Sequence, residues 1–206
     1  MPDIKESLKA ACNQMLAHTQ ELCLLDTGIG DGDHGLTTER GFLAAAQAID
    51  AYHGQDDAGL FAAIGEAMSK KMGGAIGPLY GVFWRAVGKA VQNQKLTGNN
   101  LGVALQAGCE QVMKLGRAVP GDKTLVDAML PCTQAVREGS ELLAERLHTA
   151  AQAAMEGAQS TRDMMAKKGR ARFLQEKSIG HVDAGAYSFA LFMGYWAQNA
   201  AEVKEA

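Results

Sequence analysis

The sequence predicts an all-α protein that folds as a single domain over residues 1–206. Apolar residues recur at helical spacing in one segment after another, and almost no run alternates apolar and polar residues as a half-buried strand would. Clusters of β-branched residues, which are typical of strands, are rare. No linker or internal repeat divides the chain, and its 206 residues are enough for one domain with a substantial core.

The first half of the chain predicts four helices. The first begins near Ile4 and continues toward Leu24, and the second follows a glycine-rich acidic segment and includes 42–49. The third and fourth are expected at 58–71 and 78–93. Pro78 suits the first turn of the fourth helix, because a missing N–H is no loss there.

The second half continues the same pattern. A fifth helix is centred on 101–113, and a sixth covers 125–136, with a kink expected at Pro131. Residues 140–165 form a long alanine-rich helix or a helix pair, and the last helix covers about 184–201. We therefore predict antiparallel helices with short connections. In such an arrangement alternate loops share one end, so the loops at 26–37, 73–78, 116–124 and 166–185 could gather at a single rim.

Composition excludes several classes of protein. The net charge is −3 and the isoelectric point about 6.0, and no long basic stripe exists, which argues against nucleic acid as the main ligand. No uninterrupted apolar run is long enough to span a membrane, and the polar first six residues do not resemble a signal peptide. The four cysteines fall within apolar helical patterns and form no CxxC pair, which indicates reduced core residues and a cytoplasmic location.

Residues 26–35, DTGIGDGDHG, carry the strongest chemical signal. Three carboxylates, Asp26, Asp31 and Asp33, alternate with glycines, each of which costs about 1 kcal/mol in a helix relative to alanine. The segment is therefore a loop that can turn its acids toward one point, where a hard divalent cation such as Mg²⁺ would offset their repulsion. A plain Asp/Gly turn is the alternative. An EF-hand is excluded, because its closing Glu position falls on Phe42.

Two further loops favour a phosphate ligand. Residues 73–78, GGAIGP, lie between two helical patterns, so that backbone N–H groups and a helix N-terminus could cradle a phosphate; a tight helix–helix connection is the alternative. Residues 116–124, GRAVPGDKT, nearly form a P-loop. That interpretation fails, because Asp122 separates Gly121 from Lys123 and no strand precedes the loop.

Five segments in order, DTGIGDGDHG at 26–35, GGAIGPLYG at 73–81, PGDKT at 120–124, KGRA at 168–171 and GHVDAGA at 180–186, resemble the nucleotide-binding L subunit of dihydroxyacetone kinase. The same unit forms the C-terminal domain of single-chain, ATP-dependent dihydroxyacetone kinases. The resemblance covers nearly the whole chain. It implies that residues 1–206 are one nucleotide-binding domain of this type, folded as an antiparallel eight-helix barrel.

The resemblance also implies the site. Asp26, Asp31 and Asp33 would bind two Mg²⁺ ions that bridge the phosphates of ADP or ATP. The remaining nucleotide contacts would run from the phosphates to the adenine and the closing C-terminal loop, through His34, Gly35, Leu36, Thr37, Gly74, Ala75, Ile76, Gly116, Leu125, Arg170, Asp183 and Gly185. The chain departs from the family at Ile76, where Ser is usual, and at Ala184, where Pro is frequent.

Three functions are compatible with this resemblance. In the first, tightly held ADP is phosphorylated by a phosphohistidine on an M subunit of the phosphotransferase system, and the phosphoryl group passes to dihydroxyacetone on a K subunit. In the second, the subunit uses free ATP and acts on dihydroxyacetone or another small ketose such as erythrulose. In the third, it is a nucleotide-sensing adaptor of a transcription regulator. For either kinase, the three aspartates and Arg170 would be the catalytic residues, because phosphoryl transfer depends on positioning and charge neutralisation. Lys167 and Lys168 would be a solvated helix end.

Overall fold

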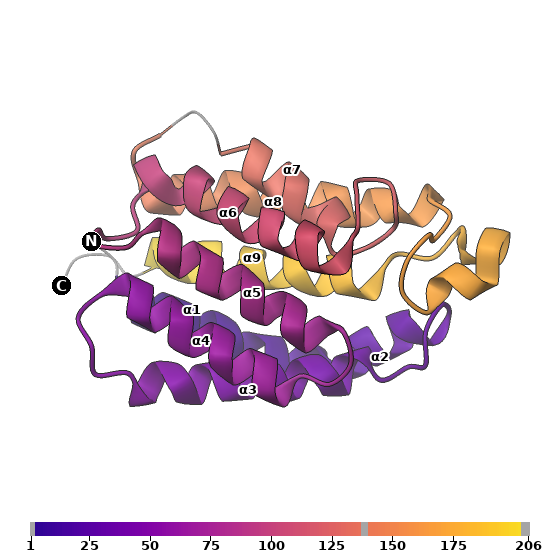
Figure 1. Cartoon of the computed structure of the whole chain (residues 1–206), viewed down its shortest axis with the longest axis horizontal. Coiled ribbons are helices and arrows are strands. Elements are labelled where there is room, and N and C mark those ends of the chain that lie inside the picture. Colours follow the sequence, from indigo (N-terminus) through magenta and orange to yellow (C-terminus); the bar gives the residue numbers. More distant parts are fainter. Residues whose placement is uncertain (1–2, 137–139, 203–206) are drawn as a thin grey trace.

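The computed structural model describes residues 3–136 and 140–202, and in this part of the chain helices joined by loops are the only regular structure, with no strand (Figure 1). The α-helices are α1 (Ile4–Met15), α2 (Thr19–Thr27), α3 (His34–Ala51), α4 (Asp57–Lys71), α5 (Ile76–Ala90), α6 (Gly98–Gly116), α7 (Val126–Gln134), α8 (Leu143–Ser160) and α9 (Ala184–Glu202). Three short 3₁₀ segments are η1 (Leu16–His18), η2 (Thr161–Asp163) and η3 (Ala171–Ser178). The all-α prediction is confirmed.

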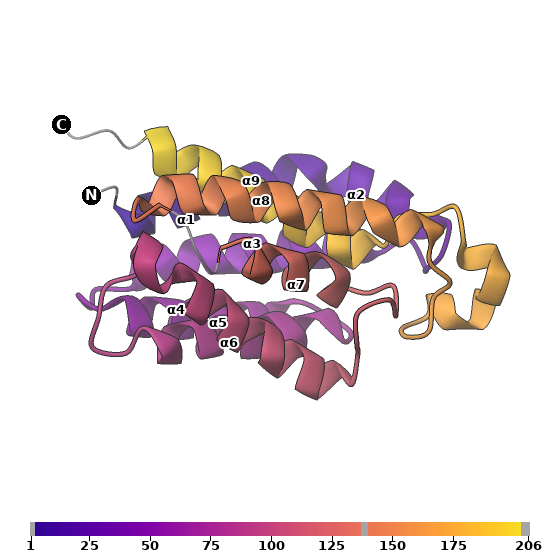
Figure 2. The same cartoon turned by 90° about the horizontal axis from the view of Figure 1, so that it is seen from above.

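The helices form a closed ring. Each of α3 to α8 packs on the next helix in the chain, α9 packs on α1, and α1 packs on α3 (Figures 1 and 2). Since η1 joins α1 and α2 into one side of the ring, the described chain makes an antiparallel eight-helix barrel, as the sequence analysis predicted. The expected first helix is interrupted at η1, where Thr19 Oγ1 donates to the Leu16 carbonyl at 3.0 Å.

Aromatic side chains fill the barrel. Phe61 and Trp84 stack with ring centroids 5.5 Å apart and planes 2° apart, and Trp196 meets Trp84 edge-on at 5.9 Å. All three side chains are completely buried. Such pairs contribute about 0.5–1.5 kcal/mol each beyond the burial of their area. These rings therefore join α4, α5 and α9 across the interior of the barrel.

Close approach of α7 and α8 depends on two small features. Pro131 lies inside α7 and has no N–H to offer the Asp127 carbonyl, yet the helix continues to Gln134. Gly157 of α8 faces that carbonyl so closely that a Cβ would lie 2.3 Å from its oxygen. A glycine is thus required at this position for the two helices to pack.

None of the helices in the described residues is both long enough and apolar enough to cross a membrane. All four cysteines are free of disulfides, and Cys12, Cys109 and Cys132 are buried in the core, as their place in the apolar pattern predicted.

Candidate functional site

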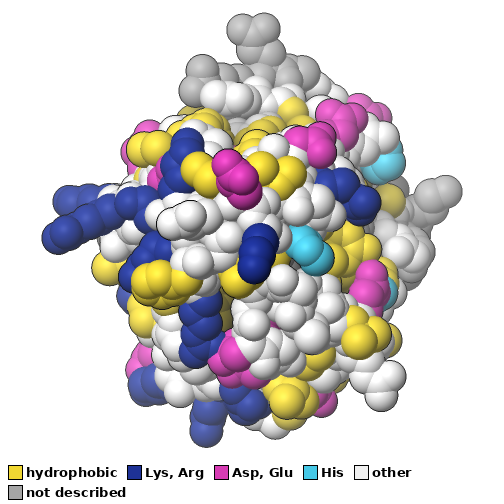
Figure 3. Space-filling view, turned by 90° about the vertical axis from the view of Figure 1, so that its right-hand side faces the viewer, with side chains coloured by type: hydrophobic (Ala, Val, Ile, Leu, Met, Phe, Trp, Pro, Cys, Tyr) yellow, Lys and Arg dark blue, Asp and Glu magenta, His cyan; other side chains and the backbone are white. Residues whose placement is uncertain are grey.

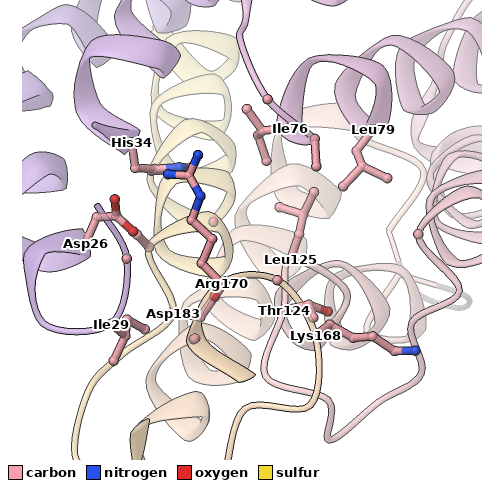
Figure 4. Close-up of a pocket in the computed structure, with 18 of the residues that line it drawn as sticks. Asp26, Ile29, His34, Ile76, Leu79, Thr124, Leu125, Lys168, Arg170 and Asp183 are labelled. Atoms are coloured by element: carbon pink, nitrogen blue, oxygen red, sulfur yellow. The ribbon is translucent and has the colours of Figure 1, made fainter. Parts of the chain in front are cut away.

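Four loops meet at one end of the barrel around a cavity of about 360 Å³. Its lining includes residues of the segments 26–37, 73–79, 116–126 and 168–185, so the rim predicted from antiparallel packing is formed. Figure 3 looks onto this end of the molecule, where Lys and Arg side chains are numerous. In the close-up, Asp26 and His34 lie on one side of the cavity, and Ile76, Leu79 and Leu125 gather on the other (Figure 4).

The three aspartates converge on the polar side. Asp26, Asp31 and Asp33 each offer a carboxylate oxygen, and these oxygens lie within 4.8 Å of one another. A tight turn after α2 produces this arrangement: the Gly30 N–H donates to the Asp26 carbonyl at 2.6 Å, and the Gly32 N–H donates to its carboxylate at 2.9 Å. Three hard anionic oxygens at this spacing fit Mg²⁺.

Two details of the loop keep these carboxylates available. Asp33 is the N-cap residue of α3, but its side chain makes no capping hydrogen bond in the described structure. Gly30 lies against Asp26, so that a Cβ at Gly30 would be 2.1 Å from Oδ1. The loop thus holds Asp26 in place through a glycine, and leaves Asp33 free to bind a ligand.

Arg170 supplies positive charge beside this trio. It forms an ion pair with Asp31, although its side chain is 64% exposed. Figure 4 shows it extending across the cavity toward Asp26 and His34. An exposed pair of this kind contributes at most about 1 kcal/mol, so the Arg170 guanidinium is free to exchange Asp31 for a phosphate.

The glycine loop lies where α5 begins. Gly74 has a φ of +61°, which favours glycine, and Ala75 precedes the first turn of α5 without a side-chain cap. Gly73, Gly74 and Ala75 all line the cavity. The N–H groups at the start of α5 therefore border the same space as the aspartates, as a phosphate cradle requires.

The segment from 119 to 127 is held by Asp127. Its carboxylate accepts the N–H of Gly121 at 2.6 Å and the N–H of Thr124 at 2.7 Å. Lys123 has a φ of +60°, and the loop brings Thr124 and Leu125 into the cavity wall. Together with Ile76 and Leu79 they make its apolar side.

Burial changes the ionisation of two lining groups. Desolvation raises the pKa of Asp183 from 3.8 to about 6, although the N–H of Ala186 donates to its carboxylate at 2.8 Å. Desolvation lowers the pKa of His34, whose Nε2 lies 2.9 Å from Ser188 Oγ. Burial therefore favours the neutral imidazole of His34, which can hydrogen-bond without adding charge.

Most of the predicted site residues line the cavity. They are Asp26, Asp31, Asp33, His34, Thr37, Gly74, Ala75, Ile76, Gly116, Leu125, Arg170, Asp183 and Gly185. Gly35 and Leu36 do not. Gly35 is buried against α2, where a Cβ would lie 1.9 Å from the Thr19 carbonyl oxygen, and Leu36 is 49% exposed outside the lining.

The structure also corrects one assignment and adds residues. Lys168 lines the cavity and belongs to a loop rather than a helix end. Its ammonium group points away from Asp26 in Figure 4. Lys123 lines the cavity as well; the sequence analysis included it in the rejected P-loop and in the PGDKT segment of the resemblance, but gave it no role. Further lining residues were not assigned individually. Ile29, Gly73, Leu79 and Ala118 lie within segments that the sequence analysis quoted, whereas Val112 lies in α6 and carries no motif.

Comparisons with known proteins identify relatives of this chain. The DAK2 domain family matches residues 28–198. The L-erythrulose kinase of Pectobacterium atrosepticum is 40% identical over 92% of this chain, which spans only 33% of that protein. The ADP-binding subunit DhaL of the PEP-dependent dihydroxyacetone kinase of Escherichia coli is 38% identical, with 86% of this chain and 87% of the relative aligned.

A solved structure shares the fold. The dihydroxyacetone kinase of C. freundii, crystallised with AMP-PNP and Mg²⁺, superposes with a TM-score of 0.75 and 27% identity over 96% of this chain and 34% of that one. The matched family covers more than half of the residues, and the aligned ADP-binding subunit matches along most of its length. This chain therefore belongs to the DAK2-domain family, and ADP-binding subunits of dihydroxyacetone kinases are among its relatives.

Proposed function

We propose that this chain is the nucleotide-binding subunit of a dihydroxyacetone kinase. It holds ADP or ATP with two Mg²⁺ ions and passes a phosphoryl group to dihydroxyacetone on a separate K subunit. One observation carries the proposal: carboxylate oxygens of Asp26, Asp31 and Asp33 lie within 4.8 Å of one another in a cavity. The glycine loop before α5 and the apolar side line the rest of that cavity. A Mg²⁺-bound phosphate tail and an adenine need these two environments side by side.

The chain's residues would divide the work as follows. The three aspartates hold Mg²⁺, which when bound offsets the phosphate charge that develops during transfer. The N–H groups at the start of α5 orient the phosphates. Arg170 exchanges Asp31 for a phosphate oxygen and donates to it through its planar fork. Ile76, Leu79 and Leu125 exclude water from the base.

The phosphoryl donor is the next part of the proposal. The E. coli and Listeria innocua relatives are named PEP-dependent. By analogy, ADP stays bound to this chain and receives its phosphoryl group from the phosphohistidine of an M subunit. We place this reaction in the cytoplasm, where such phosphotransferase components act and where the free cysteines stay reduced.

A second candidate acceptor is erythrulose. The relative at 40% identity is named L-erythrulose kinase, and two relatives in Mycolicibacterium smegmatis are named erythrulose kinases too. In this version free ATP is the donor, and the nucleotide exchanges at every turnover.

A nucleotide-retention and transfer assay tests both versions. We expect mass spectrometry of the purified protein to detect co-purified ADP that dilution does not release. With K-type and M-type partners, phosphoenolpyruvate should then drive phosphorylation of dihydroxyacetone. Rapid ADP loss together with turnover on free ATP would replace the first version by the second, and the ketose consumed would identify the acceptor. A protein that binds no nucleotide would contradict both. Nucleotide-dependent capture of a transcription regulator, without transfer, would instead favour an adaptor.

A further inference from the structure

Lys123 is a buried lysine whose three donor bonds all go to main-chain carbonyls. Its side chain is 1% exposed. Nζ donates to the carbonyl oxygens of Thr161 at 2.7 Å, Met164 at 3.1 Å and His181 at 2.5 Å. An ammonium group has three N–H donors and a neutral amine has two, so only the protonated form satisfies all three acceptors.

These carbonyls lie near the two ends of the segment that connects α8 to α9. The segment 161–183 leaves the barrel after α8, carries Arg170 and η3, and returns before α9. The two ends of this segment lie side by side and form its neck. Two further hydrogen bonds join them there: the Gly180 N–H donates to the Arg162 carbonyl at 2.7 Å, and the Asp183 N–H donates to Thr161 Oγ1 at 2.9 Å. Lys123 lies outside the segment and bonds to both of its ends through a single atom.

Lys123 itself belongs to the loop on the apolar side of the cavity. Its φ of +60° is part of the turn that brings Thr124 and Leu125 into the apolar half of the cavity. The Lys167 N–H adds a second link between the two segments, donating to the Asp122 carbonyl at 3.0 Å. Lys123 thus connects the loop on the apolar side of the cavity with the loop that carries Arg170.

The electrostatic surroundings are compatible with a buried cation. Desolvation lowers the pKa of Lys123, while the charges of Asp183, Asp163 and Asp127 act in the opposite direction. Asp183 lines the cavity beside the acidic trio. Burial outweighs these three charges in the pKa of Lys123, and the three carbonyl acceptors of the neck are the contacts that favour the protonated form.

We propose that Lys123 is a positioning residue, which fixes the neck of the 161–183 segment so that Arg170 is held over the acidic trio. This inference rests on the proposed function, since Arg170 is assigned there to the phosphate. Lys123 acts on phosphoryl transfer through Arg170 and makes no direct contact with the transferred group.

A double-mutant cycle tests the inference. Lys123→Met removes the donors at similar side-chain volume, and we expect transfer to slow by roughly tenfold or more, because small displacements of a catalytic group are costly. In an Arg170→Ala background the same change should slow transfer by less than about twofold, since contacts that act through one another are not additive. An equal loss in both backgrounds, or no loss in either, would overturn the inference.

Lys95→Met is the matched control. Lys95 Nζ also donates to a main-chain carbonyl, that of Gln55 at 2.7 Å, and it pairs with Asp57 at 3.0 Å, but it does not line the cavity. We expect this variant to leave transfer unchanged. If Lys123→Met does not fold, Lys123→Arg replaces it: the charge is kept, but a planar guanidinium cannot serve three carbonyls arranged around one ammonium nitrogen.

Hydrogen exchange separates this inference from the proposed function. In Lys123→Met, the amides of 165–180 should exchange faster, whereas those of α4 and α5 keep the wild-type rate. If the amides of 165–180 exchange at the wild-type rate in this variant, Lys123 does not fix the neck of the 161–183 segment, and the inference is overturned even if the variant is active. A wild type that shows neither nucleotide binding nor transfer would instead contradict the proposed function, and the exchange result would still decide whether Lys123 holds the segment.

Discussion

Gly30 offers a way to disturb the metal ligands without changing any of them. A Cβ at this position would lie 2.1 Å from Asp26 Oδ1, 2.6 Å from Cγ and 2.8 Å from Oδ2. Real Cβ atoms do not approach other atoms so closely, so Gly30→Ala must push the carboxylate aside. The displaced group also loses the hydrogen bond from the Gly32 N–H, at 2.9 Å, that orients it.

The expected effect is selective. Residues that orient a metal ligand without touching the metal typically contribute 10- to 100-fold to metal affinity, and we expect Mg²⁺-dependent ADP binding to weaken on the order of 10- to 100-fold. Gly30 is exposed in a loop, so the free energy of unfolding should change by less than about 1 kcal/mol. Displacement of a fluorescent ADP analogue measures the affinity, and urea unfolding measures the stability.

Gly194→Ala is the control for Gly30→Ala. Gly194 lies in α9 outside the cavity lining, and a Cβ there would have nothing within 4 Å. We expect this variant to bind ADP like the wild type. If Gly30→Ala also binds like the wild type, Asp26 is not a ligand that needs this orientation, and the reasoning is refuted.

Three further predictions concern the cavity and the core. Because burial raises the pKa of Asp183 to about 6, the folded protein holds the carboxyl proton more tightly than the unfolded chain does, and the free energy of unfolding falls as pH rises from about 4 to 6. Asp183→Asn should therefore be more stable than the wild type above pH 6, by up to about 3 kcal/mol, and no more stable below pH 4. Urea unfolding without Mg²⁺ measures this difference. Arg170→Lys removes the planar fork of the guanidinium and should slow phosphoryl transfer by about tenfold or more, with a smaller change in ADP affinity. If the transfer rate and the ADP affinity fall by the same factor, Arg170 acts in ground-state binding instead. Trp84→Ala should destabilise the fold by about 3–5 kcal/mol without changing the ADP affinity of the folded protein, and a large affinity change would connect the core to the site.

The sequence predicted the fold because helical periodicity is a local property. Every long apolar repeat became a helix, and the antiparallel order brought four loops to one end. The break at η1 was not predictable from the same pattern. Thr19 bonds to the Leu16 carbonyl there, and local side-chain bonds of this kind compete with the helix without changing the spacing of apolar residues.

The site was predicted as segments rather than as individual side chains. His34 and Thr37 are three residues apart in α3 and face the cavity together, whereas the intervening Gly35 and Leu36 point elsewhere, since each residue of a helix turns by about 100°. Motif order alone does not contain this rotation. Lys123 was missed for a different reason: its partners are 38, 41 and 58 residues away, and no local pattern reports such contacts.

Calorimetric titration of ADP into nucleotide-free protein tests the central claim most directly. We expect saturable heat with Mg²⁺, little or none when Mg²⁺ is chelated, and loss of the Mg²⁺-dependent signal in Asp31→Ala. Binding of equal strength with and without Mg²⁺, or undiminished binding by the variant, would contradict the assignment of the acidic trio as the metal site.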